Sequence, residues 1–297
     1  MTAREQGFLL LTGYLGDPER KPLTVAQFRD LTKRMRMMER PAQGRELCPE
    51  DLISIGCSRA FAERVLGLLS QTEQLQWYLS KGKRRDCVPI TRVTPGYPDA
   101  VRKCLGLTAP GVLWAKGELC LLDTPMISLV GSRDLREENY KFAREAGKQA
   151  ALQGYTLVSG NARGADRTAQ ESCLENGGSV ICVVADELEK QCVRKNVLYL
   201  SENGFDLPFS SQRALQRNRV IHSLGCKTLV AQCTLRKGGT WDGTVQNLRQ
   251  SWSPVFCFRD GSPAAAELAQ LGAAQIDTDA LVRIDDLQSV FMNFIDQ

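Results

Sequence analysis

Glycine, serine and arginine directly follow an apolar run in the segment 126–136, MISLVGSRDLR. An apolar run of this length is typical of a buried parallel strand, and a helix-like stretch follows over 139–153. Gly131 removes bulk, Ser132 adds a hydroxyl group and Arg133 adds a fixed cation. The junction therefore predicts a site for an anion at the end of a strand.

A second segment, TLVSGNARGADRTAQ, has the same character, with Ser159, Gly160, Arg163 and Gly164 placed just before a predicted helix. Glycine permits a close backbone approach and a positive φ, and the amides that open a helix are donors for an anion. One such loop is weak support, because glycine-rich turns between a strand and a helix are common, but two loops with their arginines predict one phosphate pocket. Neither loop is a Gly-x-Gly-x-x-Gly fingerprint or a Walker A loop.

Further cations follow along the chain. They would track the phosphates of a nucleic acid strand, or they would lie on solvated helix faces. Arg217 and Arg219 are about 200° apart on a helix, so at most one is expected to face a ligand while the other supports the fold. Arg213 alone is interpreted as part of a solvated face. The candidate contacts in this part of the chain are Arg194, Lys195, Arg217, Asn218 and Arg219.

Composition limits the class of protein. The chain has 297 residues, enough for one large or two medium domains, and its 43% hydrophobic and 24% charged residues are typical of a soluble globular protein. The apolar runs are too short to span a membrane, and the apolar core at 8–11 makes a poor secretory signal. We expect a cytoplasmic protein without a membrane partner.

The cysteines and the charge balance are also consistent with a cytoplasmic protein. Eleven cysteines are scattered without a Cys-x-x-Cys pair, and His222 is the single histidine. This indicates reduced, mostly buried thiols and predicts neither a metal site nor a cofactor. The net charge of +4 is too small to demonstrate nucleic acid binding, but it permits a basic stripe on one face.

Residues 1–85 are predicted to form a small helical domain of the SAM or helix-hairpin-helix type. In LTVAQFRDLTKRMRMM, apolar residues recur at helical spacing and Thr24 is a candidate N-cap. PEDLISIG and CSRAFAERVLGLL predict a helix, a glycine turn at Gly56 and a second helix. A packing role for this turn is favoured over a backbone contact with nucleic acid. A linker is predicted at 81–87, where charged residues interrupt the apolar periodicity.

From about residue 88 onward, predicted strands and helices alternate, which indicates an α/β fold with a doubly wound, mostly parallel sheet. Ligands of such sheets bind outside the carboxyl ends of the strands, so the loops after Val130, Val158, Val184, Val230 and Phe258 are the candidate positions for function. The predicted strands are 88–91, 112–117, 126–133, 156–160, 179–185, 228–232 and 254–258, and the predicted helices lie near 98–105, 139–153, 166–176, 195–203, at Arg219 and after Gly243.

Several ordered motifs resemble the DNA-processing protein family DprA, also called Smf. They are YPDAVRKCLGLTAPGVLWAKG, SLVGSR, VSGNARGADRTAQ, GGSVICVVA, KNVLYLSENG, QRNRVI, KGGTWDGT and LAQLGAAQI, which together cover about residues 88–277. The resemblance implies an extended Rossmann-like domain over 86–277, preceded by the helical domain and followed by a short tail, 278–297, without a winged helix. It also implies a non-enzymatic protein, usually a homodimer, that binds and protects single-stranded DNA and helps to load RecA recombinase during natural transformation.

The resemblance also implies roles for particular residues. Gly131, Ser132 and Arg133 would hold a DNA phosphate, and Ser159, Gly160, Arg163 and Gly164 would line the same pocket. The family's basic position before its Asn-x-x-Leu stretch corresponds to Arg194, with Lys195 adjacent, and its Arg-Asn-Arg motif corresponds to Arg217, Asn218 and Arg219.

Three motifs depart from the family pattern. Gly164-Ala165-Asp166 followed by Ala169-Gln170 replaces Gly-Ile-Asp followed by Ala-His, Ala214-Leu215 replaces Phe-Pro, and Gly238-Gly239-Thr240-Trp241 replaces Ser-Gly-Ser-Leu. These changes are expected to alter the shape of the pocket more than its charge.

Two other functions stay open at this stage. A nucleotide phosphoribohydrolase of the same superfamily would need a carboxylate near the position of Gln246, which cannot ionise, and Asp166 is better explained as a residue that braces its loop. A nucleotide sensor would use the same phosphate loops, but the additional basic residues favour a longer ligand. As candidate stacking partners for bases, Phe205, Phe209 and Trp241 are each interpreted as packing residues.

Overall fold

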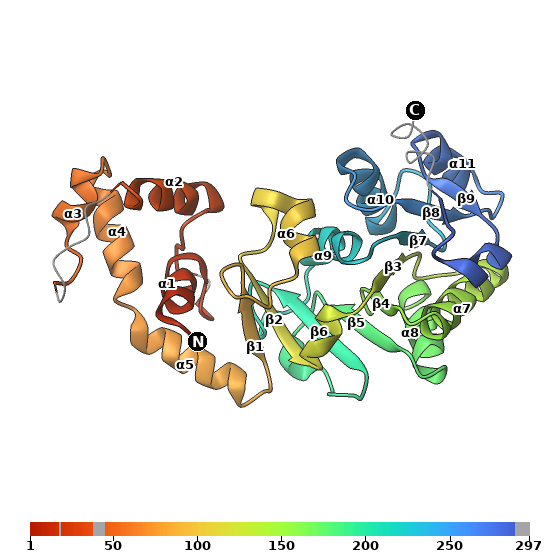
Figure 1. The fold of residues 1–297 in the computed structure, drawn as a ribbon, viewed down its shortest axis with the longest axis horizontal. Helices are drawn as coiled ribbons and strands as arrows, with labels where there is room; N and C mark the ends of the chain where they lie inside the picture. Colours follow the sequence, from red (N-terminus) through yellow and green to blue (C-terminus); the bar gives the residue numbers. More distant parts are fainter. Residues whose placement is uncertain (18, 38–44, 289–297) are drawn as a thin grey trace.

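The computed structural model describes residues 1–17, 19–37 and 45–288. Figure 1 shows a helical region at one end of the molecule and a broad sheet with helices on both faces in the remainder. The helices of the first region lie within residues 3–83, and the first strand of the sheet begins at Val88.

One sheet of nine strands organises the described part of the chain, in the order β1-β2-β6-β5-β4-β3-β7-β8-β9. Neighbouring strands from β6 to β9 run parallel, whereas β2 pairs antiparallel with both β1 and β6. The predicted mostly parallel, doubly wound sheet is confirmed. The strands are β1 (Val88–Thr91), β2 (Val112–Gly117), β3 (Met126–Val130), β4 (Thr156–Ser159), β5 (Ser179–Val183), β6 (Val197–Glu202), β7 (Thr228–Val230), β8 (Val255–Phe258) and β9 (Ala274–Ile276).

Helices cover both faces of the sheet and bury an apolar cluster on each. Phe142 of α7 and Ala169 of α8 belong to one cluster, and Ile221 of α9 and Trp241 of α10 belong to the other. The connections from β3 to β5 therefore lie on one face and those from β6 to β8 on the other, as right-handed crossovers that run in opposite directions along the sheet require. The helices are α6 (Asp99–Leu105), α7 (Glu137–Leu152), α8 (Ala165–Glu175), α9 (Ser211–Leu224), α10 (Gly239–Gln250) and α11 (Pro263–Gln270).

Five helices form the region before the sheet, and two sequence signals set their boundaries. Thr24 caps the second helix through its side chain and Gln27 returns the bond, while Gly56 turns the chain at φ +84°. Both features were predicted. The helices are α1 (Ala3–Thr12), α2 (Val25–Met35), α3 (Pro49–Ser54), α4 (Arg59–Leu69) and α5 (Thr72–Lys83).

The helical region shares a core with the sheet. Leu9 of α1 and Tyr78 of α5 lie in the same apolar cluster as Trp114 of β2, and Phe205 stacks on Tyr78 at a centroid distance of 4.7 Å. The Tyr78 hydroxyl also donates to Asp206 at 2.7 Å. The division into domains 1–85 and 86–277 stays a prediction, because this shared core crosses the proposed linker.

The prediction of a helix near 195–203 is wrong, because this segment is β6. Val197 and Tyr199 pack into the cluster on one face of the sheet, while Leu198 and Leu200 pack into the cluster on the other face. A short apolar run cannot be told from a buried helix segment by periodicity alone, and Leu198 and Leu200 are good helix formers, unlike the β-branched residues of β5. No helix or strand was predicted for α11 and β9, although the motif LAQLGAAQI overlaps both.

The first part of the predicted tail is packed rather than free. Thr278–Arg283 forms a 3₁₀ helix, and the side chains of Leu281, Ile284 and Leu287 are buried in the cluster that contains Phe142 of α7. The remainder of the tail, residues 289–297, lies outside the described residues.

Two broader expectations concern the whole chain. In the described ranges, each helix falls short of the length and apolar character that crossing a bilayer requires. All eleven cysteines are free thiols, and six of them are buried, including Cys173 and Cys257. Burial raises the pKa of Cys173 to about 12, so this thiol stays protonated at neutral pH.

Candidate nucleic-acid interface

Two adjoining cavities lie at the carboxyl ends of the parallel strands, and we call them together the edge pocket. The first, of about 390 Å³, lies between the loop after β3, helix α9 and the start of α10. The second, of about 440 Å³, lies among the loops after β3, β4 and β5. Arg133, Phe209 and Arg217 line both cavities. The two glycine-rich loops therefore meet in one place, as their positions at strand ends predict.

Glycine is required where these two loops touch. A Cβ on Gly164 would lie 2.4 Å from the carbonyl oxygens of both Ser132 and Arg133, and Gly164 has φ +86°. A Cβ on Gly131 would lie 2.4 Å from the Cβ of Ala165, whose amide donates to the Ser132 carbonyl at 3.1 Å. These glycines therefore lock the two loops together, in addition to leaving room at the pocket.

A buried arginine and a buried aspartate lie beneath the second loop. Arg217 is 9% exposed, and its Nη2 donates to the carbonyl of Gly160 at 3.1 Å. Asp166 accepts from the amides of Gly160 and Ala162 at 3.1 and 3.2 Å, so it braces the loop as expected. Burial raises the pKa of Asp166, and Arg217 opposes this shift; burial likewise lowers the pKa of Arg217, and Asp166 opposes it.

Arg217 lines both cavities and retains hydrogen-bonding capacity. A guanidinium group carries five N–H donors. The Nε atom of Arg217 is buried and has no partner among the described residues. The bond to Gly160 is the one side-chain hydrogen bond that Arg217 makes with a described residue, so its charge and its other N–H donors suit an acceptor at the pocket, such as a phosphate oxygen.

Arg133 and Arg163 differ sharply, although both were predicted to bind phosphate. The side chain of Arg133 is exposed at the pocket and makes no hydrogen bond or ion pair with another described residue. Arg163 donates to Asp134 at 2.6 Å in a pair whose side chains are 72% and 86% exposed. The charge of Arg133 is thus free for a ligand, while that of Arg163 is partly compensated.

The expectation that the amides of both glycine-rich loops are free for an anion is wrong for several of them. The amide of Ser132 donates to Gln232, that of Ala165 to Ser132, and those of Gly160 and Ala162 to Asp166. The glycines can be recognised in the sequence. The acceptors of the neighbouring amides cannot, because they belong to other parts of the chain.

The start of α10 supplies amides that the loops do not. Gly238, at φ +88°, leads into the helix, and Gly238, Gly239 and Thr240 line the first cavity. The first N–H groups of an α-helix lack acceptors within the helix and attract anions. The Thr240 hydroxyl donates to the Gly131 carbonyl at 2.9 Å, which fixes this helix end against the loop after β3.

The three residues of the Arg-Asn-Arg motif have separate positions. Arg217 faces the edge pocket, while Arg219 pairs with Glu202 at 2.7 Å and also donates to the carbonyl of Thr108. Asn218 lines the first cavity and donates to the Gly239 carbonyl at 2.9 Å. This separation of the two arginines agrees with their predicted angular spacing.

Three predicted residues lie apart from the centre of the edge pocket. Ser159 is fully buried and its hydroxyl accepts a hydrogen bond from Gln170, so it supports the loop and cannot reach a strand of DNA. Arg194 lines a separate cavity of about 220 Å³, which shares Arg167 with the second cavity. Lys195 is exposed and lines neither of these cavities.

Arg213 is not on a solvated helix face. Its guanidinium donates to the carbonyls of Ala185, Leu207 and Pro208 at 2.7 to 2.8 Å, and to the Ser201 hydroxyl at 2.9 Å. The arginine therefore holds the segment before α9, which carries Phe209, in place.

Sequence reasoning missed residues that line the edge pocket. Phe209 was interpreted as a packing residue, but it is 54% exposed at both cavities, whereas Phe205 and Trp241 are buried as expected. Lys237 and Thr240 follow β7, a strand end that was singled out without choosing residues in it. The KGGT run within that loop was the available signal.

The fold and the site define a class of protein: a doubly wound α/β protein with an arginine-lined pocket at the carboxyl ends of its parallel strands. The sequence model of the DNA recombination-mediator protein A family matches residues 89–281. This match covers well over half of the chain, which therefore belongs to that family.

Individual relatives agree with this membership. The DNA processing protein DprA of Streptococcus pneumoniae R6 is 31% identical over 178 residues, covering 56% of this chain and 63% of the relative. The chain thus spans less than two thirds of that protein's length.

Solved structures show the same fold. The X-ray structure of DprA from Streptococcus pneumoniae has a TM-score of 0.71 and 23% identity, and the match covers 97% of this chain and 99% of the other. A structure of DNA processing protein A from Helicobacter pylori, described as revealing a single-stranded DNA binding mode, has a TM-score of 0.58 and 22% identity over 68% of this chain and 97% of the other.

Proposed function

We propose that this protein binds single-stranded DNA at the edge pocket as part of DNA recombination. The observation that carries the proposal is the pair Arg133 and Arg217, which line the same two cavities and form no ion pair with a described residue. Lys237 adds a further cation to the first cavity, and Arg167 adds one to the second. Family membership supports the same ligand.

In the proposed complex, one phosphate lies between Arg133 and Arg217 and accepts hydrogen bonds from the backbone amides at the start of α10. Neighbouring phosphates contact Lys237 on one side and Arg167 on the other. The exposed ring of Phe209 stacks against a base. Stacking of this kind requires an unpaired base and tolerates any sequence, so the site favours single strands with little base preference.

The proposal contains no catalytic step. Asp242 and Gln246, on α10, are exposed and line neither cavity of the edge pocket. His222 is fully buried among Thr228 and Asn247, away from any substrate. Protection of the strand, assistance in loading RecA recombinase, homodimer formation and a cytoplasmic location complete the proposal. Their support is the resemblance to DprA.

The test is fluorescence anisotropy with labelled oligo-dT over a salt series, with the duplex and ATP as competitors. Replacing Arg133 by Ala is expected to weaken binding by about 1 to 3 kcal/mol, because it removes a charge-assisted contact. The slope of log affinity against log salt should become shallower by about 0.7, the value for one phosphate contact on a single strand.

Arg144→Ala is the matched control, because Arg144 pairs with Glu175 on α7 and α8, and lines neither cavity. It should bind oligo-dT as the unmodified protein does. Equal affinity of Arg133→Ala and the unmodified protein would refute the assignment of the pocket. Displacement of the oligonucleotide by ATP at comparable concentrations would instead indicate a nucleotide sensor.

A further inference from the structure

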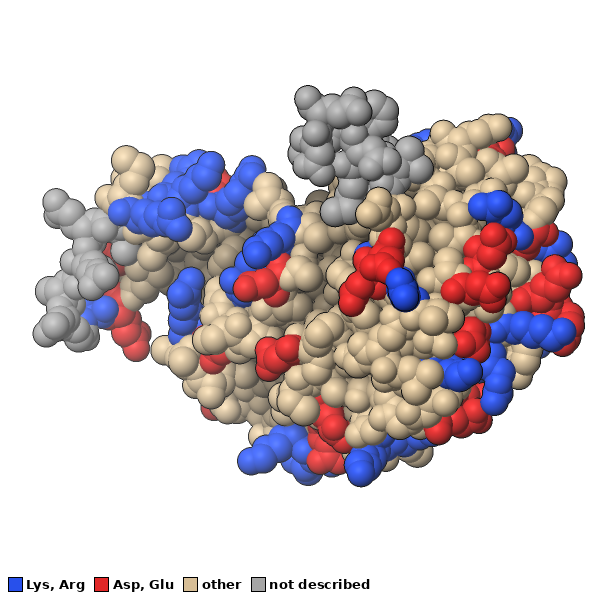
Figure 2. Space-filling view, turned by 45° about the vertical axis from the view of Figure 1, so that its right-hand side comes forward, with Lys and Arg blue, Asp and Glu red and all other residues tan. Residues whose placement is uncertain are grey.

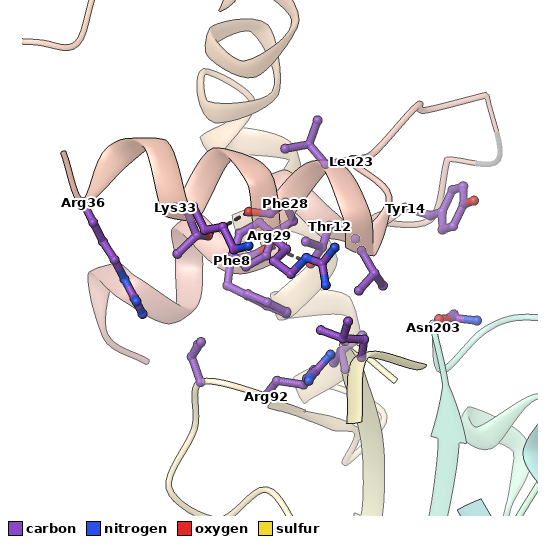
Figure 3. Close-up of a pocket in the computed structure, with 17 residues that line it drawn as sticks. Phe8, Thr12, Tyr14, Leu23, Phe28, Arg29, Lys33, Arg36, Arg92 and Asn203 are labelled. Atoms are coloured by element: carbon purple, nitrogen blue, oxygen red, sulfur yellow. Dashed lines mark hydrogen bonds between the residues drawn. The ribbon is translucent and has the colours of Figure 1, made fainter. Parts of the chain in front are cut away.

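A second basic site lies in the helical region, in a groove bordered by α1, α2 and the segments around β1 and β2. We call it the α2 groove; its volume is about 440 Å³ (Figure 3). Apolar side chains form its floor, among them Phe8 and Phe28, whose rings meet edge to face at a centroid distance of 5.1 Å. Tyr14 is 45% exposed and also lines the groove.

Cations line this groove without acidic partners. Arg29 and Lys33 project from α2, Arg36 directly follows this helix, and Arg92 faces them from the segment after β1. Among its described lining residues there is no aspartate or glutamate, and none of the four cations forms an ion pair with a described residue. By contrast Arg34, on the same helix but outside the groove, pairs with Asp30 at 2.8 Å.

The arrangement of these cations suits an anion between them. Figure 3 shows Arg29 and Arg92 extending into the groove from opposite sides, and Figure 2 shows lysine and arginine side chains gathered over the helical region. Arg92 donates to the carbonyl of Gly106 at 2.9 Å, which holds its guanidinium in place. Like charges that converge without a counterion create a positive potential, which an anionic ligand would relieve.

The combination of rings and evenly spaced cations fits a nucleic acid strand. Arg29 and Lys33 are one helical turn apart, about 6 Å along the axis, so they can contact successive phosphates of an extended strand. Aromatic rings such as Phe28 and Tyr14 supply faces for unpaired bases. Asn203, at one end of the groove, offers an amide donor and acceptor to a base edge.

The α2 groove is connected to the edge pocket along the chain. Asn203 directly follows β6, at the same edge of the sheet where the loops after β3, β4 and β5 form the edge pocket. The segment 203–210 leads from Asn203 to Phe209, which lines both cavities of that pocket. The two sites therefore lie at the same edge of the sheet, and one short segment of the chain joins them.

We propose that the α2 groove is a second binding site for the same DNA strand, which takes the nucleotides that extend beyond the edge pocket. The inference rests on the proposed function of the edge pocket, but it concerns a different surface and different residues. It makes binding depend on oligonucleotide length, because only a strand long enough to reach both sites contacts the cations of α2.

The test compares oligo-dT of about 6 nucleotides, within the range of a single site, with oligo-dT of roughly 25 nucleotides. The variant carries Arg29→Ala and Lys33→Ala, two exposed positions whose removal leaves no buried group unpaired. For the long strand we expect an affinity loss of about tenfold or more and a salt slope shallower by about 1.4, two contacts at 0.7 each. The short strand should bind unchanged.

Arg59→Ala controls for the loss of positive charge in the helical region, because Arg59 is 65% exposed and lies outside the groove. Equal binding of the long strand by the double variant and the Arg59→Ala control would overturn the groove proposal. Unchanged binding by Arg133→Ala would instead overturn the edge pocket, so the two failures are distinguishable. A loss of equal size for both strand lengths would also contradict the inference, since it would not depend on reaching the groove.

Discussion

The edge pocket and the α2 groove both present cations to solvent, but they hold them in different ways. In the edge pocket, Arg217 is 9% exposed and is fixed by the Gly160 carbonyl, and interlocked glycines set the loops around it. In the groove, Arg29 and Lys33 are exposed on one face of a helix with no buried network behind them. The first site is thus built by folding, while the second relies on side chains that can adapt.

This difference teaches how one strand would be held. A cation that is already fixed loses little conformational entropy when a phosphate arrives, so the edge pocket should determine where the strand is anchored. Exposed lysine and arginine side chains lose more rotamer freedom and are screened by salt, so the groove should add affinity without defining a register.

The largest effect should come from a substitution that separates the two loops of the edge pocket. Gly164→Ala places a Cβ 2.4 Å from two backbone oxygens at φ +86°. We expect a loss of about 4 kcal/mol of unfolding free energy, from about 1 to 3 for a backbone conformation that other residues rarely adopt and about 1 to 3 for the overlap. Urea denaturation of the variant and the unmodified protein measures this difference in unfolding free energy.

Gly177→Ala is the matched control for this loss. Gly177 follows α8 at φ +77° and has nothing within 4 Å of a new Cβ, so it should lose only the contribution from the backbone. Equal losses in the two variants would show that the contact between the loops adds nothing to stability, and the contrast with the groove would disappear.

Acid should lower the unfolding free energy through His222, which is buried on α9, the helix that carries Arg217. The groove has no histidine among its lining residues. Burial, assisted by Arg217, lowers the pKa of His222 from 6.5 to about 3. As the pH falls, the unfolded chain therefore takes up a proton on this histidine before the folded chain does. The contribution of neutral His222 to the unfolding free energy is complete above about pH 6.5 and is lost progressively towards pH 3. At pH 5 the loss relative to pH 8 should be about 2 kcal/mol.

His222→Gln isolates this contribution, since His222 is the single histidine of the chain and Gln can keep a bond to Asn247. Between pH 8 and pH 5, the unfolding free energy of the variant should fall by about 2 kcal/mol less than that of the unmodified protein. An identical pH dependence in both proteins would show that this histidine is not held neutral by burial.

The smallest effect should come from the aromatic contact at the mouth of the edge pocket. Phe209→Ala should weaken oligo-dT binding by about 1 kcal/mol, at the lower end for a base on an aromatic ring, because the ring is 54% exposed. The salt slope should stay unchanged, since no phosphate contact is lost. Anisotropy over a salt series separates this result from that of Arg133→Ala, and a shallower slope for Phe209→Ala would show that its ring does not act by stacking.

The sequence alone predicted the parts of this structure that depend on local signals. Periodicity located most strands and helices, Thr24 identified a helix start, and the two glycine-rich loops were correctly placed at neighbouring strand ends. β6 was missed because its short apolar run contains leucines, which favour a helix as readily as a strand.

The remainder depends on contacts between residues far apart in the chain. Ser159 is buried and bonded to Gln170, so it does not reach the candidate surface, and the charge of Arg163 is partly compensated by Asp134. The α2 groove combines residues from α1, α2, the loop after β1 and the end of β6, so no single segment of the sequence shows it.

The most direct test of the central claim is a crystal structure of the protein with a short oligo-dT. The account predicts a phosphate within hydrogen-bonding distance of the guanidinium groups of both Arg133 and Arg217, next to the start of α10. DNA bound elsewhere on the molecule, with both arginines free of phosphate, would contradict it.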